Sequence, residues 1–230
     1  MKFQGKTCLI TGAAGNLGRA VAAAFAAQGA SLILMDQRDE HLRSAFGSEG
    51  KGKRFARADL RDAESVARAL PAGTRIDILC NIAGGFRMGQ PVHETPEDTW
   101  ELMLGLNAKS VINCARAVVP GMLAAGYGKI INIGAVAGLS GKANMGPYSA
   151  SKSAVIRLTE SMSAELRDKG INVNCILPSI IDTPQNRADM PKADPRRWVA
   201  PEALAEVVLF LASDAARAIH GAAIPVTALV

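Results

Sequence analysis

The stretch that decides the fold is Thr7–Gly18, TCLITGAAGNLG, in which an apolar run leads directly into a glycine-rich turn. The run predicts a buried strand, and the alanine-rich residues Asn16–Gln28 predict a helix that Gly29 ends. Glycines are needed where a backbone turns tightly or approaches a pyrophosphate, and a helix N-terminus offers unpaired N–H groups to phosphates. The stretch therefore predicts a dinucleotide-binding turn made by Gly12, Gly15, Asn16, Leu17 and Gly18.

Short apolar runs alternate with helical segments along the rest of the chain. Because these runs are continuously apolar, we expect strands buried on both faces, which is typical of a parallel sheet covered by helices. The sequence predicts an α/β fold, a Rossmann-type doubly wound parallel sheet in three layers, as a single domain over residues 1–230. The expected strands are 7–11, 31–36, 53–59, 76–82, 129–134, 171–177 and 223–227, with a charged helix after the second that runs to Phe46.

One segment does not fit this alternation. Asp182–Trp198 is rich in proline and charge, and it follows the sixth expected strand. Such a stretch is either a plain surface loop or a flap that covers a site. Its place in the chain favours a flap over the substrate.

Composition narrows the class of function. The 230 residues are 49% hydrophobic and 20% charged, which is ordinary for one globular domain. The formal net charge is +5, but basic and acidic residues are interspersed, which argues against a nucleic-acid groove. A mild positive field also suits an anionic cofactor.

Cysteines and histidines give no sign of a metal site. The cysteines lie in apolar stretches without a CxxC pair, so we expect buried reduced thiols, and the histidines are scattered. We find no run of about 18 uncharged apolar residues and no signal-peptide core, so we expect no membrane span and a cytoplasmic location. The residues are Cys8, Cys80, Cys114, Cys175, His41, His93 and His220.

An acidic residue strengthens the prediction of a dinucleotide site. Asp36 ends the second expected strand, 18 residues after Gly18, where a carboxylate accepts hydrogen bonds from the adenosine ribose. A carboxylate there also repels a 2′-phosphate, which favours NADH over NADPH, although nearby Arg38 leaves the choice open. The alternative is an ordinary turn residue.

Further motifs follow along the chain. They are Asp59-Leu60, Asn81-Ile82-Ala83-Gly84, Asn107 within LNA, Tyr148-Ser149-Ala150-Ser151-Lys152 (YSASK) and Pro178–Thr183 (PSIIDT). With the glycine turn, and in this order, they make the chain resemble the classical short-chain dehydrogenase/reductase family over essentially its whole length.

The resemblance implies a role for each motif. Asp59 and Leu60 would contact adenine, Asn81 would stabilise the central sheet, and Ala83 and Gly84 would pass under the cofactor. Tyr148 would exchange the proton with the substrate oxygen, Lys152 would hold the nicotinamide ribose, and Asn107 would anchor a water of the proton relay. Pro178, Ile181 and Thr183 would hold the nicotinamide amide.

The YxxxK spacing itself suits this chemistry. Tyr148 and Lys152 are four residues apart on an expected helix, so they lie on one face about one turn apart. A free tyrosine has a pKa of about 10, and a nearby ammonium would lower that value. By contrast, we expect Lys109 and Lys142 to be plain surface charges.

Two departures concern the cofactor site. Asn16 stands where the family's TGxxxGxG has its middle glycine, and Gly15 comes one position earlier. Asn tolerates the left-handed conformation, so we expect the phosphate loop to survive. Ser179 replaces a family glycine, which would reshape the nicotinamide pocket.

The third departure concerns catalysis. The family has a serine thirteen residues before the tyrosine, and this chain has Ala135 there. Loss of one positioned donor to an oxyanion typically costs about 10²–10³ in rate. Either the substrate does not need that hydroxyl, or Ser140, Asn144 or Ser179 replaces it, or the protein is an NAD-binding pseudoenzyme or regulatory scaffold with little turnover.

The first alternative has a precedent in the family. Dihydropteridine reductase has an alanine at the same place, and its catalytic segment is locally similar to Asn144–Tyr148, so a quinonoid substrate is one hypothesis. A small carbonyl or alcohol substrate is another, and an enzyme like 3-oxoacyl-carrier-protein reductase is a further one.

Assembly follows only from the resemblance. The expected helices 108–125 and 145–167 are rich in Ala, Val, Leu and Ile. In the family the corresponding helices pair across two-fold axes, which implies a homodimer or homotetramer. The alternative is that these apolar faces only pack on their own sheet.

Overall fold

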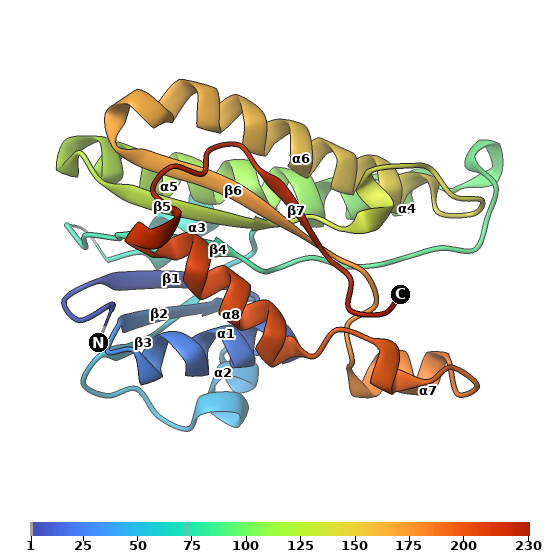
Figure 1. Cartoon of the computed structure of the whole chain (residues 1–230), viewed down its shortest axis with the longest axis horizontal. Helices are drawn as coiled ribbons and strands as arrows, with labels where there is room; N and C mark the ends of the chain where they lie inside the picture. Colours follow the sequence, from blue (N-terminus) through green and yellow to red (C-terminus); the bar gives the residue numbers. More distant parts are fainter. Residues whose placement is uncertain (1, 72) are drawn as a thin grey trace.

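Seven parallel strands form one sheet, whose order is β3-β2-β1-β4-β5-β6-β7. The computed structural model describes residues 2–71 and 73–230. The chain starts in the middle of the sheet, winds to one edge and returns to build the other, so the predicted doubly wound fold is confirmed (Figure 1). The strands are β1 (Thr7–Thr11), β2 (Ser31–Asp36), β3 (Lys53–Arg57), β4 (Ile78–Asn81), β5 (Gly128–Ile133), β6 (Ile171–Pro178) and β7 (Ala223–Val226).

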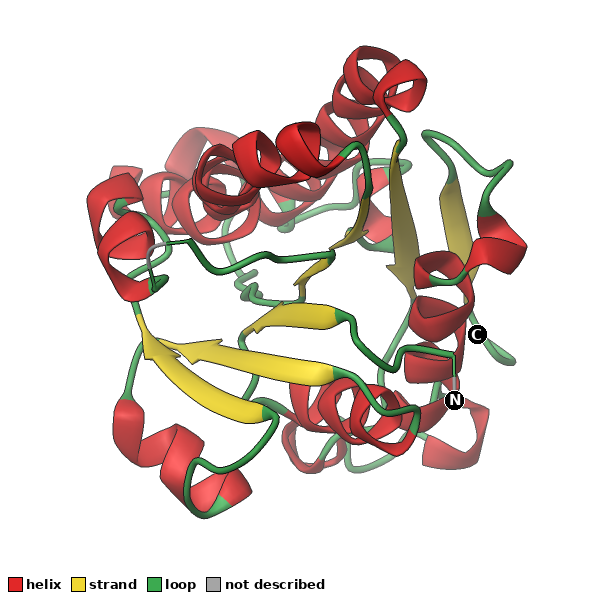
Figure 2. Cartoon of the chain, turned by 90° about the vertical axis from the view of Figure 1, so that its left-hand side faces the viewer, coloured by secondary structure: helices red, strands yellow, loops and turns green. Residues whose placement is uncertain are grey.

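Helices cover both faces of this sheet, which gives three layers (Figure 2). The α-helices are α1 (Asn16–Ala27), α2 (Asp39–Phe46), α3 (Ala63–Ala69), α4 (Glu97–Leu104), α5 (Ser110–Ala125), α6 (Gly146–Leu166), α7 (Pro184–Asp189) and α8 (Pro201–Ala212). Short turns of 3-10 helix are η1 (Val92–Glu94), η3 (Val136–Gly138), η4 (Arg167–Lys169), η5 (Pro195–Arg197) and η6 (Asp214–Ala216).

Alternate side chains of each strand enter different cores. In β1, Cys8 and Ile10 pack with α1 and α8, whereas Leu9 packs on the other face with α3, α5 and α6. Because both faces are covered, the strands need apolar residues at every position, which explains their unbroken apolar runs.

Two strands are shorter than predicted. The runs 53–59 and 76–82 end as strands at Arg57 and Asn81. Beyond Asn81 the chain leaves the ladder, because the N–H groups of Ile82 and Ala83 donate to the Thr11 hydroxyl at 3.1 and 3.2 Å. The residues that follow β4 are thereby free to line the cleft.

The segment Glu97–Ala125 bears on the expected absence of a membrane span. It is a continuous helix of 29 residues in which α4 and α5 are joined by a π-helical turn, η2 (Gly105–Lys109). By length and composition it is apolar enough to cross a membrane, which the charge criterion applied to the sequence did not predict. Its apolarity has a local cause, since Cys114, Val118 and Met122 are buried against the sheet.

The predicted flap is an ordered excursion after β6. It contains α7, and it is tied at both ends because Asp182 N–H donates to Val199 O and Val199 N–H to Ile180 O. Arg187 pairs with Asp182 at 2.6 Å across its base. Whether this segment acts as a flap stays a prediction.

Gly18 allows α1 to start close to the end of β1. A Cβ atom at Gly18 would lie 2.2 Å from Gly12 O and 2.7 Å from Ala13 O, both of them backbone atoms. A Cβ at Gly15 would meet only Gly12 O, at 3.3 Å. The two glycines of one turn therefore differ sharply in how much space they leave.

We therefore expect Gly18→Ala to lower the free energy of unfolding by about 3 kcal/mol or more, since the backbone must shift to admit the methyl group. Gly15→Ala should cost less than about 1 kcal/mol, because its neighbour has only to yield slightly. Urea denaturation of both variants measures the difference. Equal losses in the two variants would contradict this account of the turn.

Candidate active site

A cleft of about 590 Å³ lies at the carboxyl ends of the central strands. This is where open α/β sheets bind ligands, and the volume suits a cofactor. Most of the residues predicted to bind the cofactor line it: Gly12, Gly15, Asn16, Leu17, Gly18, Asp36, Asp59, Leu60, Ala83, Gly84, Ile181 and Thr183.

The glycine turn presents backbone to this cleft. Gly12 has φ +61°, and a Cβ there would lie 2.8 Å from the Cα of Ala83, so neither a side chain nor an ordinary residue conformation fits. Gly15 caps α1 and has no side chain to occupy the first N–H groups of the helix. These N–H groups and the positive end of the helix dipole form an anion site.

Asn16 takes a different conformation from the one we expected. It is the first residue of α1, and it is not among the described residues with positive φ. Its side-chain oxygen accepts a hydrogen bond from Arg19 at 2.9 Å. The residue of this turn with left-handed backbone is Gly12. Gly15 caps the helix one position earlier than in the family pattern, so Asn16 is already helical.

Asp36 is fixed at the cleft by backbone donors. Its two carboxylate oxygens accept from the N–H of Ala14 at 3.2 Å and of Gln37 at 2.9 Å. The carboxylate therefore stands beside the glycine turn, at the end of β2. It is poised to accept hydrogen bonds from a diol.

Asp59 lies at the same end of the cleft but is already paired. Arg61 donates to both of its oxygens, at 3.1 and 2.9 Å, and this ion pair holds the pKa of Asp59 below its ordinary value. The neighbouring Leu60 carbonyl accepts from the Asn113 side chain at 2.8 Å. Helix α5 thus holds the loop after β3 against the cleft.

Tyr148 is packed under an aromatic ring. The ring of Phe86 meets it edge-on, with centroids 4.8 Å apart and planes at 87°. Burial raises the pKa of Tyr148 to about 12, which is opposite to the direction we expected from a nearby ammonium. Tyr148 therefore keeps its proton at neutral pH in this structure.

Lys152 lies one helical turn further along α6 and is buried. Its ammonium donates to Ile133 O, the last carbonyl of β5, at 2.8 Å. Burial lowers the pKa of Lys152 to about 8. A Cβ at Gly84 would lie 3.2 Å from this Nζ atom, so Lys152 reaches the back wall of the cleft without lining it.

Asn107 is held rigidly in the π-helical turn. Its side-chain oxygen accepts from Gly85 N–H at 2.9 Å, and its amide donates to Gly85 O at 3.1 Å and to Ser151 Oγ at 2.9 Å. Ser151 in turn donates to Tyr148 O at 2.8 Å. One amide thus connects the turn after β4 with the helix that carries Tyr148 and Lys152.

Some predicted residues stand away from the cleft. Asn81 is buried and donates to Asn132 at 2.8 Å within the sheet, and Pro178 is buried at the end of β6. Ala135 is buried after β5. Of the candidate replacements for a serine there, Ser179 donates to Thr227 O, and Ser140 and Asn144 are exposed.

The sequence did not single out several residues that line the cleft. Most of them are neighbours in sequence of a predicted site residue, and that proximity was the signal by which they could have been found. Leu102 and Leu106 lie on the same continuous helix as Asn107. These residues are Ala14, Gln37, His41, Ala58, Arg61, Ile82, Leu102 and Leu106.

Comparisons with known proteins agree with this geometry. The family model for short chain dehydrogenases matches residues 6–194. The 3-oxoacyl-[acyl-carrier-protein] reductase FabG of Thermotoga maritima is 36% identical over 236 residues, with 96% of each chain covered. The meso-2,3-butanediol dehydrogenase of Serratia marcescens is 35% identical over 241 residues, which cover 98% of this chain and 94% of the relative.

Solved structures are similar over the whole chain. A short chain dehydrogenase/reductase family protein superposes with a TM-score of 0.92 and 31% identity, covering 99% of this chain and 98% of its own. NAD+-bound xylitol dehydrogenase gives a TM-score of 0.90 and 29% identity, covering 98% of this chain and 99% of its own.

The buried lysine should cost stability. Folding lowers the pKa of Lys152 from 10.5 to about 8, so the folded state binds its proton more weakly and the free energy of unfolding rises with pH across that window. We expect Lys152→Met to raise the free energy of unfolding at pH 7 by up to about 3 kcal/mol, at about 1.36 kcal/mol per pKa unit.

Urea denaturation at pH 7 and at pH 10.5 checks this, and the advantage of the variant should fade at the higher pH. Lys142→Met, at an exposed position, serves as the control and should change little at either pH. A Lys152→Met variant that is less stable than the wild type at pH 7 would show that the bond to Ile133 O outweighs desolvation.

Proposed function

This chain belongs to the short-chain dehydrogenase family, and on that premise we propose that it transfers hydride between NAD(H) and a small carbonyl or alcohol substrate. It is an oxidoreductase of that family, and the finer assignment rests on the site. The observation that carries it is the convergence of Tyr148, Lys152 and Asn107 beside a cleft whose glycine turn leaves room for a dinucleotide.

The residues present fit a nicotinamide dinucleotide. The glycines at 12 and 18 let the turn pack tightly against Ala83 and against its own backbone, and the uncapped start of α1 offers N–H groups to a diphosphate. Asp36 would accept hydrogen bonds from the adenosine ribose and repel a 2′-phosphate, which supports NADH over NADPH. The bound nicotinamide would supply or accept the hydride.

Tyr148 would act as the acid in the direction of reduction. The phenol is protonated at neutral pH and can donate its proton to a carbonyl oxygen, but burial raises its pKa to about 12, so release of the proton needs a positive charge close to the phenolate. Lys152 would orient the ribose and, as a cation, would stabilise the phenolate that remains. Asn107 would keep the turn at Gly85 in register with α6 and anchor the water that returns the proton.

Ala135 restricts the substrate. With a methyl group in place of the family serine, the developing oxyanion meets one fewer donor, at a typical cost of about 10²–10³ in rate. The substrate should therefore be electrophilic enough to react with one acid, as a quinonoid compound or an activated carbonyl is. A 3-oxoacyl thioester is the second candidate, favoured by the 36% identity to a 3-oxoacyl-carrier-protein reductase.

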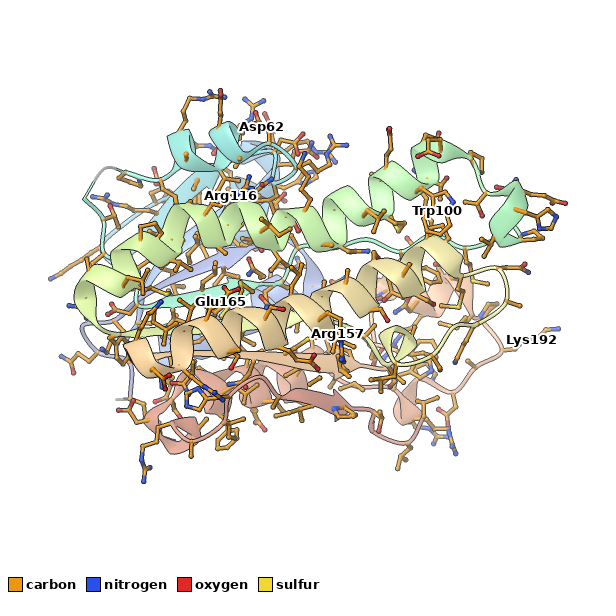
Figure 3. All side chains as sticks on the ribbon, turned by 90° about the horizontal axis from the view of Figure 1, so that it is seen from above. Asp62, Trp100, Arg116, Arg157, Glu165 and Lys192 are labelled. Atoms are coloured by element: carbon orange, nitrogen blue, oxygen red, sulfur yellow. The ribbon has the colours of Figure 1, made fainter. Side chains whose placement is uncertain are left out.

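Assembly and location are further parts of the proposal. We place a homodimer or homotetramer interface on the outer faces of α5 and α6, where Arg116, Arg157 and Glu165 are exposed (Figure 3). The four cysteines are buried and unpaired, which supports a reducing, cytoplasmic location.

Tyr148→Phe tests the enzyme assignment. Removal of the phenol hydroxyl should lower kcat for NADH oxidation by at least about 10², the usual size of a general-acid effect, while NADH affinity stays within about twofold. Steady-state assays with carbonyl, quinonoid and 3-oxoacyl thioester substrates, together with NADH fluorescence titration, measure both. Tight NADH binding without oxidation by any substrate would favour the pseudoenzyme.

Asp36→Ala tests the cofactor preference. The change removes the acceptor for the ribose hydroxyls and the charge that opposes a 2′-phosphate, so Kd should rise at least about tenfold for NADH and fall or stay level for NADPH. Fluorescence titration with both cofactors gives the ratio. An unchanged ratio of the two Kd values would mean that a group other than Asp36 binds the adenosine ribose.

A further inference from the structure

Exposed apolar side chains gather on two segments that flank the catalytic helix. Phe86, Met88 and Val92 follow β4, and Leu139 follows β5, with exposed fractions of 54%, 58%, 59% and 57%. Side chains of this size are expensive to leave in water, and an apolar patch of this kind marks a binding site. Both segments follow carboxyl ends of strands, where α/β sheets bind ligands.

Direct contacts join these segments around Tyr148. Phe86 meets the Tyr148 ring edge-on, and Gly89 N–H donates to Asn144 O at 3.0 Å. Val92 lies against the start of α6, since a Cβ at Gly146 would come 2.6 Å from its Cγ2 atom. Figure 3 shows Trp100 of α4 beside the same helix start, so the apolar wall continues onto that helix.

The polar groups near Tyr148 are already engaged. Ser151 donates to Tyr148 O, and the amide of Asn107 binds Gly85 and Ser151. Ser179 donates to Thr227 O, and position 135 carries only a methyl group. These groups are therefore occupied within the protein, while Ser140 and Asn144 are exposed on the segment after β5.

The two segments that carry these apolar side chains have charge of one sign. Between residues 85 and 92 and between 135 and 145, the charged side chains are Arg87 and Lys142, and both are exposed. These two segments therefore offer no negative charge to a cationic substrate, and Phe86 gives the surface next to Tyr148 an apolar character.

We infer that the substrate is a ketone, or the matching alcohol, whose carbon skeleton is apolar around the reacting centre, and that Phe86 selects it. This inference rests on the proposed function and narrows its substrate class. A polyol or a sugar would place hydroxyl groups against Phe86 and Leu139 and lose their hydration without replacement hydrogen bonds.

A matched pair of ketones tests this. Cyclohexanone and tetrahydropyran-4-one have the same ring size and differ by one methylene exchanged for oxygen. Neither is an activated carbonyl, so with Ala135 in place of the serine we expect slow turnover of both. NADH-dependent reduction of each ketone gives a value of kcat/KM, and the ratio of the two values is the preference for cyclohexanone. The two ketones differ in intrinsic reactivity, but this difference is the same for every variant and cancels when the ratios of two variants are compared. Burial of one methylene corresponds to about a fourfold effect.

We expect Phe86→Ser to lower the cyclohexanone preference at least about threefold, mainly through KM, and Phe86→Leu to retain most of it. Phe210→Ser changes an exposed aromatic on α8 that lines a separate pocket with Phe3 and Leu209, so it is the matched control and should leave the ratio unchanged. Since Phe86 is 54% exposed, its replacement should not unfold the protein.

The outcomes separate the two proposals. An equal fall in kcat for both ketones, with the ratio unchanged, would show that Phe86 only positions Tyr148 and would overturn the inference. Reduction of dihydroxyacetone or erythrulose in preference to cyclohexanone would also overturn it, while the proposed function would stand. Bound NADH that no carbonyl compound oxidises would instead overturn the proposed function.

Discussion

The contact between the first turn and the fourth strand is the constraint on which the site depends. The Thr11 hydroxyl accepts from Ile82 and Ala83 N–H, which draws the chain after β4 against Gly12. This contact turns Gly84 and Gly85 toward Asn107 and Lys152, so that one hydroxyl aligns the phosphate end of the cleft with its catalytic end. A residue without that oxygen would remove the partner of the Ala83 N–H and leave the Ile82 N–H with only the carbonyl of Cys80.

Helix α6, which carries Tyr148 and Lys152, is also held in place by a small number of hydrogen bonds. Asn107 occupies a π-helical turn, which is a geometry often found at functional sites. From there it binds Gly85 and Ser151, and Ser151 binds the carbonyl of Tyr148. The positions of the acid and of the buried lysine are therefore set by backbone and amide contacts, and not by direct contact between the two side chains.

The sequence predicted the sheet well because unbroken apolar runs and a glycine turn are local signals. It predicted less about states that depend on packing. The direction of the Tyr148 pKa follows from burial, which the YxxxK spacing does not reveal. The helical conformation of Asn16 follows from the position of Gly15, and the pairing of Asp59 with Arg61 depends on rotamers. The apolarity of the helix over 97–125 is shared by membrane spans and buried helices, so composition alone did not separate them.

The two edges of the sheet set how copies of this chain can meet. β3 reads KRFAR, so an incoming strand would face three cations, and β7 contains Pro225, which lacks the N–H that a new neighbour would need. Growth of the sheet from one molecule into the next is thereby blocked at both margins. The carboxyl ends of the strands, by contrast, stay open toward the cleft.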